Sequence, residues 1–451
     1  MNVHYIESDG LLIAYFPDTR RIFCINEKAK ELIESVKAEK SKEDILLDFG
    51  ISETEYKEYY NKIFTIDDTF INKMSKNKSG DDLSRLVIHI TNDCNMRCKY
   101  CYANGGHYLS QRGMLQQKTL DKCLEVFFSK FNKIYSVQFF GGEPLLNMDL
   151  LEYACQRIHD ISQKRNYKIN FGIVTNATLI TEKFIELVNK YNISVTISYD
   201  GNPEVNNIVR CLENGANSTE LILENAKKLS DQTGQPDTIE VTYNKYHVEK
   251  SVGILDVVKH IHKELPNAYI HLVPAGGSEE CEYAIKDLSM FKESVREIFS
   301  YNCSKNNQDE MLMYSLIQRI VNALNNKQYR SVNICDAGIG TISVAIDGSV
   351  YPCFMFTDND VMSYGNIFDK ELFKSEKYLN LKKELEEFSL KEKNKKCQAC
   401  FIKDLCNGCL GLNSFYTGNP FVLSDEICNM FRQMTEMVII EMVKWHKNRK
   451  E

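Results

Sequence analysis

The segment LVIHITNDCNMRCKYC, residues 86–101, decides the fold. Its first part, residues 86–91, is an apolar run rich in β-branched side chains, which is typical of a buried strand. Three cysteines, Cys94, Cys98 and Cys101, follow on the loop directly after this strand. The sequence therefore places reactive side chains at the carboxyl end of a strand, the edge at which α/β proteins build their sites.

Five more apolar runs alternate with helix-period segments downstream of this first strand. They are VQFFGG (137–142), INFGIVTN (169–176), ISVTISYD (193–200), TIEVTY (238–243) and AYIHLV (268–273). Repeated alternation of strand and helix indicates a parallel sheet. Six such units predict an α/β fold with a partial (β/α)6 barrel, and a doubly wound sheet is the alternative.

The residues before the first barrel strand predict a small winged-helix-like domain, residues 1–78. Helical patterns begin at Asn26, Ser41 and Ser52, and the two serines each precede an acidic side chain by three residues, which is a capping signal. Three short β runs come first, at 4–7, 11–16 and 21–25, and a polar linker is expected at 73–82.

The rest of the chain divides into four predicted parts. They are the barrel at 84–305, a helical bridge at 306–334, a cysteine-rich irregular domain at 335–430 and a C-terminal helix at 431–451.

The composition excludes several classes of protein. A net charge of -7 offers no basic field for phosphates, so no nucleic acid partner is expected. The sequence has no apolar run of about 18 residues and no basic and apolar start typical of a secretion signal, so neither a membrane span nor export is expected. These features predict a cytoplasmic protein. Sixteen cysteines are many for a reducing compartment, and their clustering indicates metal binding.

The CxxxCxxC spacing of Cys94, Cys98 and Cys101 predicts a [4Fe–4S] cluster with one open iron, because three thiolates leave one iron without a protein ligand. A structural zinc site is the alternative. It requires a fourth close ligand, and His107 lies outside the usual spacing.

With the motifs that follow, this pattern resembles the radical S-adenosylmethionine (SAM) superfamily. In that family the amino and carboxylate groups of SAM chelate the open iron, and reductive cleavage yields a 5′-deoxyadenosyl radical. The resemblance implies SAM contacts at the strand ends, with turns and ordinary packing as the alternative. The implied contacts are Tyr102 near adenine, Gly141, Gly142, Glu143 and Pro144 at the methionyl amino group, Thr175 and Asn176 in a TNGT-like segment, Ser198 and Asp200 in an SxDG segment, and Arg210 at the SAM carboxylate.

These residue types suit such contacts. Glu143 offers an acceptor to an ammonium group, and the planar fork of Arg210 can bond a carboxylate bidentately. The glycines let the backbone approach a ligand closely. In the TNGT-like segment Ala177 stands where the family has glycine.

The C-terminal cysteines resemble a SPASM domain, which holds two auxiliary [4Fe–4S] clusters and would bring the total to three. The resemblance implies one closed cluster and one cluster that lacks a ligand. The closed set is Cys397, Cys400, Cys406 and Cys428, and the three-cysteine set is Cys335, Cys353 and Cys409. Only two residues separate Cys406 from Cys409, where the family commonly has three, and a zinc ribbon of Cys397, Cys400, Cys406 and Cys409 is the alternative.

The missing ligand has two candidate sources. A substrate cysteine could supply it, as in thioether-forming maturases, which the arrangement resembles. An internal group such as Cys303 or a carboxylate is the alternative. The other cysteines are predicted to be small buried side chains. They are Cys24, Cys123, Cys155, Cys211, Cys281 and Cys303.

The N-terminal domain resembles a PqqD-like peptide recognition element, in which a leader peptide adds a strand to the sheet edge. A DNA-binding winged helix is the rival interpretation. Residues 1–75 contain 15 acidic and 10 basic side chains, a balance that opposes DNA binding.

Together these resemblances predict a radical SAM peptide maturase, most like the sactipeptide and ranthipeptide enzymes, that forms a thioether after hydrogen abstraction from a peptide carbon. The implied partners are a leader-bearing, cysteine-containing precursor peptide and an electron donor such as ferredoxin or flavodoxin. Carbon–carbon cross-linking and side-chain oxidation, as in sulfatase maturation, are the alternatives within this class. A non-catalytic iron–sulfur sensor that binds DNA is the alternative from another class.

Overall fold

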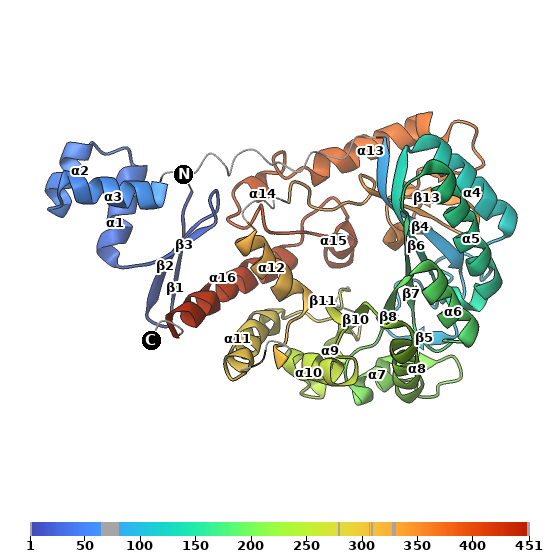
Figure 1. Cartoon of the computed structure of the whole chain (residues 1–451). Coiled ribbons are helices and arrows are strands. Elements are labelled where there is room, and N and C mark those ends of the chain that lie inside the picture. Colours follow the sequence, from blue (N-terminus) through green and yellow to red (C-terminus); the bar gives the residue numbers. More distant parts are fainter. Residues whose placement is uncertain are drawn as a thin grey trace.

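A computed structural model of the chain describes residues 2–64, 81–277, 280–305, 307, 310–326 and 331–448. Its centre is a curved sheet with helices on the outer side (Figure 1). Six parallel strands form the barrel part: β4 (Asp82–Thr91), β6 (Lys133–Gly141), β7 (Asn170–Thr175), β8 (Ser194–Ser198), β10 (Thr238–Tyr243) and β11 (Tyr269–Pro274). The connecting helices are α4 (Gln117–Lys130), α5 (Met148–Arg165), α6 (Glu182–Tyr191), α7 (Pro203–Val209), α8 (Thr219–Thr233), α9 (Lys245–Glu249) and α10 (Ile254–Glu264).

The six barrel strands lie side by side in chain order. A doubly wound sheet would reverse its strand order at a switch point, and these six strands do not. The predicted partial (β/α)6 barrel is therefore confirmed.

Side chains of the barrel strands alternate between the helices and the barrel interior. On β10, Ile239 and Val241 are fully buried, whereas Glu240 between them is half-buried. This period of two is expected where one face packs under helices and the other faces the interior. The interior face is therefore available for a site.

The sheet continues into the C-terminal region. Strand β12 (Thr341–Val344) pairs in parallel with β4, and β13 (Ser349–Tyr351) and β14 (Gly365–Asn366) follow antiparallel, which gives nine strands in all. The cysteine-rich domain is thus less irregular than predicted. Its strands are only two to four residues long, too short to show a clear period in the sequence.

The N-terminal domain is a three-stranded antiparallel sheet with three helices. Ser41 Oγ accepts from the N–H of Asp44 at 3.1 Å, and Ser52 and Glu55 cap each other reciprocally, which confirms both capping signals. The predicted linker lies mostly outside the described residues, and β4 already begins at Asp82. The elements are β1 (His4–Ser8), β2 (Leu11–Phe16), β3 (Arg21–Ile25), α1 (Glu27–Lys37), α2 (Lys42–Phe49) and α3 (Glu53–Phe64).

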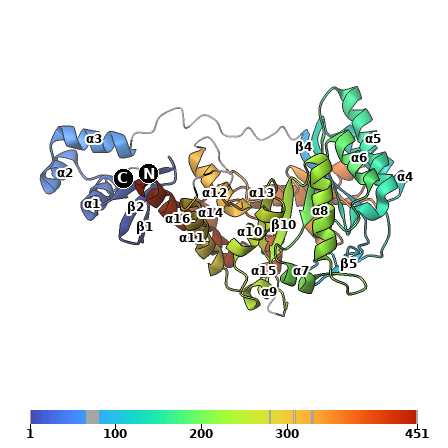
Figure 2. The same cartoon turned by 60° about the horizontal axis from the view of Figure 1, so that its bottom comes forward.

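Helices dominate the rest of the chain. The last helix begins at Asp425 rather than at 431, because Ser424 Oγ caps it by accepting from Ile427 N–H at 3.2 Å. This helix packs against α11, α12 and β1, and Figure 2 shows it between the N-terminal domain and the barrel. The helices are α11 (Ser289–Cys303), α12 (Ser315–Asn325), α13 (Glu376–Ser389), α14 (Lys395–Gln398), α15 (Leu410–Thr417) and α16 (Asp425–Asn448). Among the described helices, none is both long and apolar enough to cross a bilayer.

Candidate active site

The cysteine loop after β4 gathers three thiols. Burial raises the pKa of Cys94 to about 12, and the nearby thiols of Cys98 and Cys101 add to this effect. Backbone N–H groups of Met96 and Gly105 donate to Cys94 Sγ and Cys101 Sγ, each at 3.4 Å. Such backbone donors are the bonds that cluster sulfurs accept.

Two glycines bring the second strand end against this loop. Gly141 has φ 139°, and a Cβ on it would lie 2.1 Å from the carbonyl oxygen of Thr91. A Cβ on Gly142 would lie 2.1 Å from the carbonyl oxygen of Asp93. The two glycines therefore bring the end of β6 close to the backbone of β4 and of the loop that follows it. Pro144 follows as the first residue of a 3₁₀ turn, Pro144–Asn147.

Glu143 is fully buried and ties the ends of β6 and β7 together. Its carboxylate accepts from Thr175 Oγ1 at 2.7 Å, from Asn176 N–H at 2.7 Å and from Leu145 N–H at 3.0 Å. Burial raises the pKa of Glu143, and these three bonds oppose the shift. A carboxylate has about four acceptor positions, so one remains for a ligand ammonium.

The TNGT-like segment meets the cysteine loop. Asn176 Nδ2 lies 3.7 Å from Cys94 Sγ and donates to Asn95 Oδ1 at 2.9 Å. Ala177 has φ 59°, a left-handed backbone that explains why glycine suits this position.

Arg210 reaches the cysteine loop through a small antiparallel pair, β5 (Met96–Cys98) and β9 (Arg210–Leu212), in which Cys98 stands opposite Arg210. Arg210 Nη1 donates to the Tyr100 hydroxyl at 2.9 Å, and that hydroxyl donates to Asp200 Oδ2 at 2.7 Å. Arg210 is buried, and its Nε has no hydrogen-bond partner in the described part of the chain. It therefore keeps a donor free for an anionic ligand.

Tyr100 was not predicted as a site residue. Its only sequence signal was its position between Cys98 and Cys101. Ser198 lies beside Glu240 in the strand register, and that interior carboxylate was missed as well.

Tyr102 lies near two cysteine sets. Its ring neighbours Tyr108, with centroids 6.1 Å apart, and Phe415 of α15, with centroids 6.2 Å apart. Tyr102 directly follows Cys101, and α15 begins directly after Cys409 of the three-cysteine set. This tyrosine therefore lies near both the loop after β4 and the three-cysteine set.

The C-terminal cysteines form two groups. Burial raises the pKa of Cys353 to about 12, with Cys409 and Cys335 as the neighbouring thiols that add to the shift. The other group forms around Cys406. Burial raises its pKa to about 12 as well, with contributions from Cys428, Cys400 and Cys397. This grouping is the one that the SPASM resemblance implies, and cluster ligation remains a prediction.

The donor chemistry fits iron–sulfur clusters, because soft thiol donors gather in sets of three and four. Burial disfavours the free thiolates, so metal coordination would have to drive their deprotonation. Within the described ranges, no three or more His, Cys, Asp or Glu side chains are arranged to hold a single metal ion.

The cysteines outside the three sets differ in how exposed they are. Cys123 and Cys155 are buried as predicted, Cys211 and Cys281 are only partly buried, and Cys24 and Cys303 are exposed, which corrects the prediction for these last two. Cys24 lies on β3, an edge strand, and Cys303 is the last residue of α11.

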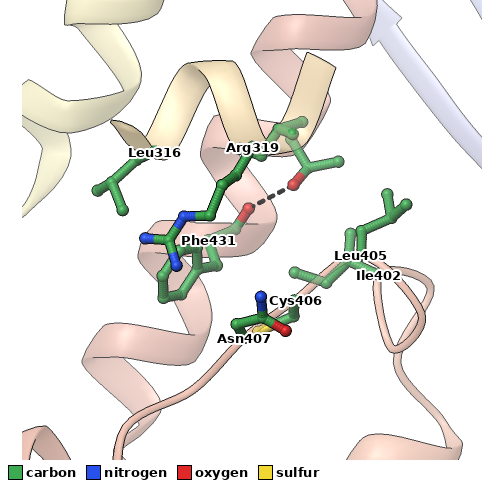
Figure 3. Close-up of a pocket in the computed structure, with 9 residues that line it drawn as sticks. Leu316, Arg319, Ile402, Leu405, Cys406, Asn407 and Phe431 are labelled. Carbon is green, nitrogen blue, oxygen red and sulfur yellow. Dashed lines mark hydrogen bonds between the residues drawn. The ribbon is translucent and has the colours of Figure 1, made fainter. Parts of the chain in front are cut away.

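A small cavity of about 10 Å³ lies beside Cys406, between α12, α16 and the loop 402–407. Figure 3 shows Arg319 reaching into it over Phe431. This volume is close to the minimum for one water molecule, so it offers no room for a substrate.

Comparison with known proteins gives two domain matches. Residues 88–244 match the radical SAM superfamily, and residues 335–401 match SPASM, an iron–sulfur cluster-binding domain. Among curated proteins, the radical SAM cyclopropyl synthase TigE of Paramaledivibacter caminithermalis is 23% identical over 395 residues, 81% of this chain and 76% of TigE.

Two solved structures share the fold. The enzyme anSMEcpe, with bound AdoMet and the Kp18Cys peptide, superposes with a TM-score of 0.65 at 19% identity, over 81% of this chain and 99% of that one. Streptococcus suis SuiB bound to precursor peptide SuiA gives a TM-score of 0.52 at 16% identity, over 92% of this chain and 96% of that one. The two matched domains imply SAM and iron–sulfur clusters as cofactors. The chain therefore carries a radical SAM domain followed by a C-terminal SPASM domain.

Proposed function

We propose that this chain is an enzyme that modifies a ribosomally synthesised peptide by forming thioether bonds between cysteine sulfur and a peptide carbon. Three [4Fe–4S] clusters would be held by the ten cysteines of the three sets. Bound SAM at the first cluster would supply a 5′-deoxyadenosyl radical that abstracts hydrogen from the peptide.

One observation carries the proposal: Tyr102 directly follows Cys101, and its ring neighbours Phe415 of α15, the helix that begins directly after Cys409. A peptide held beside Tyr102 would meet the radical source on one side and the three-cysteine set on the other. The cysteines that act most strongly on Cys353 are Cys409 and Cys335. An iron without a fourth protein thiolate could bind a substrate thiolate.

The protein residues around SAM have distinct tasks in this proposal. Glu143 would accept from the SAM ammonium at its remaining acceptor position, and Arg210 would bond the SAM carboxylate through its free donor. Thr175 and Asn176 hold Glu143 by hydrogen bonds, and Tyr100 holds Arg210. Because these hydrogen bonds are already present before SAM binds, less conformational entropy is lost on binding.

The N-terminal domain would bind the leader as a PqqD-like element. Its sheet has two edges, β1 and β3, and β1 is covered because it packs against α16. Beside the sheet, α3 carries a row of aromatic rings, Tyr56, Tyr60 and Phe64, that continues to Phe16. A leader strand would add to β3 and rest on these rings.

The test uses the anaerobically reconstituted full chain with SAM, dithionite and a cysteine-bearing precursor peptide. We expect 5′-deoxyadenosine and a peptide two hydrogens lighter, with cysteine sulfur bonded to carbon. Binding of the cysteine peptide should also alter the Mössbauer spectrum of one auxiliary cluster, and a serine-substituted peptide should not. Identical spectra with both peptides at saturation would refute direct thiolate ligation.

Carbon–carbon bond formation is the second candidate, because the relative TigE is a cyclopropyl synthase. A lighter product that still reacts with a thiol alkylating reagent would favour it. Side-chain oxidation without a cross-link would favour a sulfatase-maturase-like reaction. A non-catalytic DNA-binding sensor would form no 5′-deoxyadenosine at all.

A further inference from the structure

Lys391 is a buried lysine just beyond the end of α13, with only 5% of its surface exposed. Lysine is almost never this buried unless its charge is paired. In the described part of the chain, no carboxylate lies within ion-pair distance of its ammonium. No directly paired carboxylate therefore supplies its counter-charge, and Asp404 acts on it only from beyond that distance.

Four acceptors surround Lys391 Nζ. It donates to the carbonyl oxygens of Ser331 at 2.9 Å and Lys403 at 2.7 Å, to the carbonyl oxygen of Cys406, and to Ser331 Oγ at 2.8 Å. Ser331 Oγ itself donates to the carbonyl oxygen of Asn333, so it acts on Lys391 only as an acceptor. The three carbonyl oxygens can only accept, so they need the three hydrogens of an ammonium, because a neutral amine has only two. Burial lowers the pKa of Lys391, whereas these three bonds favour the charged ammonium.

That charge lies against the four-cysteine set. Two of its acceptors, the carbonyls of Lys403 and Cys406, belong to the loop between Cys400 and Cys406. Cys406 is itself one of the four cysteines, and its carbonyl oxygen accepts directly from the ammonium. The positive charge is thus bonded to the backbone of the loop that carries two cysteines of the set.

We propose that Lys391 is the built-in counter-charge of the cluster held by Cys397, Cys400, Cys406 and Cys428, and that it raises the reduction potential of this cluster. The inference rests on the proposed cluster assignment. Reduction adds a negative charge to an already anionic site, and a fixed cation in a low-dielectric interior favours that change. The closed cluster would then accept electrons more readily than it would without the lysine.

The experiment measures midpoint potentials by anaerobic redox titration with electron paramagnetic resonance detection. Lys391→Met should shift the reduction equilibrium of one auxiliary cluster at least tenfold toward the oxidised form, which is about 59 mV for one electron. Lys391→Arg keeps the charge and should stay within threefold of the wild type. Lys395→Met removes an exposed lysine two residues before Cys397 and should also stay within threefold, because water screens that charge.

A Lys391→Met protein with full iron and an unchanged potential would overturn the proposal. If Lys391→Met loses iron instead, the iron content of Lys391→Arg separates the two explanations. A cluster retained in Lys391→Arg supports the counter-charge. Loss of iron in both variants means that packing alone maintains the site. Wild-type iron near eight per chain, rather than the twelve of three clusters, would remove the cluster assignment itself.

Discussion

The imidazole of His4 lies flat on the ring of Phe401, with centroids 3.6 Å apart and planes 3° from parallel. His4 Nε2 is also 2.7 Å from a carboxylate oxygen of Glu436 on α16. Phe401 directly follows Cys400, so the N-terminal domain is docked on the loop that carries part of the four-cysteine set.

Replacing Phe401 with alanine should loosen this docking. Phe401 also meets the Tyr15 ring edge-on at 6.3 Å, and each aromatic pair contributes about 0.5–1.5 kcal/mol. Hydrogen exchange at the β1 amides should therefore become roughly tenfold faster. Phe368→Ala, at a side chain that is 48% exposed, serves as the control. Equal β1 exchange in both variants would mean that the ring stack carries no docking energy.

Replacing Cys94, Cys98 and Cys101 together with alanine should abolish SAM cleavage, because these thiols would hold the only cluster that binds SAM. Iron should fall from about twelve to about eight per chain, since the other seven cysteines remain. Chromatography for 5′-deoxyadenosine and iron analysis check the two parts separately. Continued SAM cleavage would place the reactive cluster elsewhere.

Tyr100→Phe should weaken SAM binding. The change removes the hydroxyl that joins Arg210 to Asp200 and leaves two buried charged groups each short of a bond, at a cost of about 1–3 kcal/mol. We expect a roughly tenfold higher Kd by anaerobic calorimetry. Tyr246→Phe is the matched control, because its hydroxyl bonds at the surface to Lys99. An unchanged Kd for Tyr100→Phe would show that Arg210 needs no orientation by this hydroxyl.

Tyr60→Ala should reduce leader affinity if the leader lies along β3 and α3. The Tyr60 ring lies between those of Tyr56 and Phe64, tilted against both, and is 42% exposed. Its loss should remove about 1 kcal/mol of binding free energy, or roughly fivefold in Kd. Tyr59→Ala is the control, since Tyr59 is 47% exposed on another side of the same helix. Fluorescence anisotropy with a labelled leader measures both, and equal effects would argue against this binding face.

Much of the fold followed from local patterns. The six barrel strands were predicted because each is an apolar run bounded by turn signals, and Ser41 and Ser52 cap helices through bonds within a few residues. The pairing of β12 with β4 was not predictable, because it joins residues distant in the chain. The start of α16 was placed too late because Ser424 was not recognised as its cap.

The candidate site, like the fold, was predictable where the sequence signal is local and not where it depends on distant residues. Cysteine spacing grouped the thiols, since metal ligands follow strict spacing rules. Tyr100 and Lys391 were missed because their roles depend on partners far along the chain. Tyr100 bonds Asp200 and Arg210, and Lys391 bonds Ser331. A single sequence does not reveal such pairs.

The pairing of β4 with β12 also has a consequence for synthesis on the ribosome. One edge of β4 pairs with β6, and the other, at Arg85–Ile88, stays bare until residues 341–344 have been made. At about 5–20 residues per second, that interval is roughly ten to fifty seconds. An unpaired apolar edge invites contact with other chains during that time. The strand that leads into the first cysteine loop is therefore among the last parts of the barrel to be completed, and a chain truncated before β12 would leave it bare permanently.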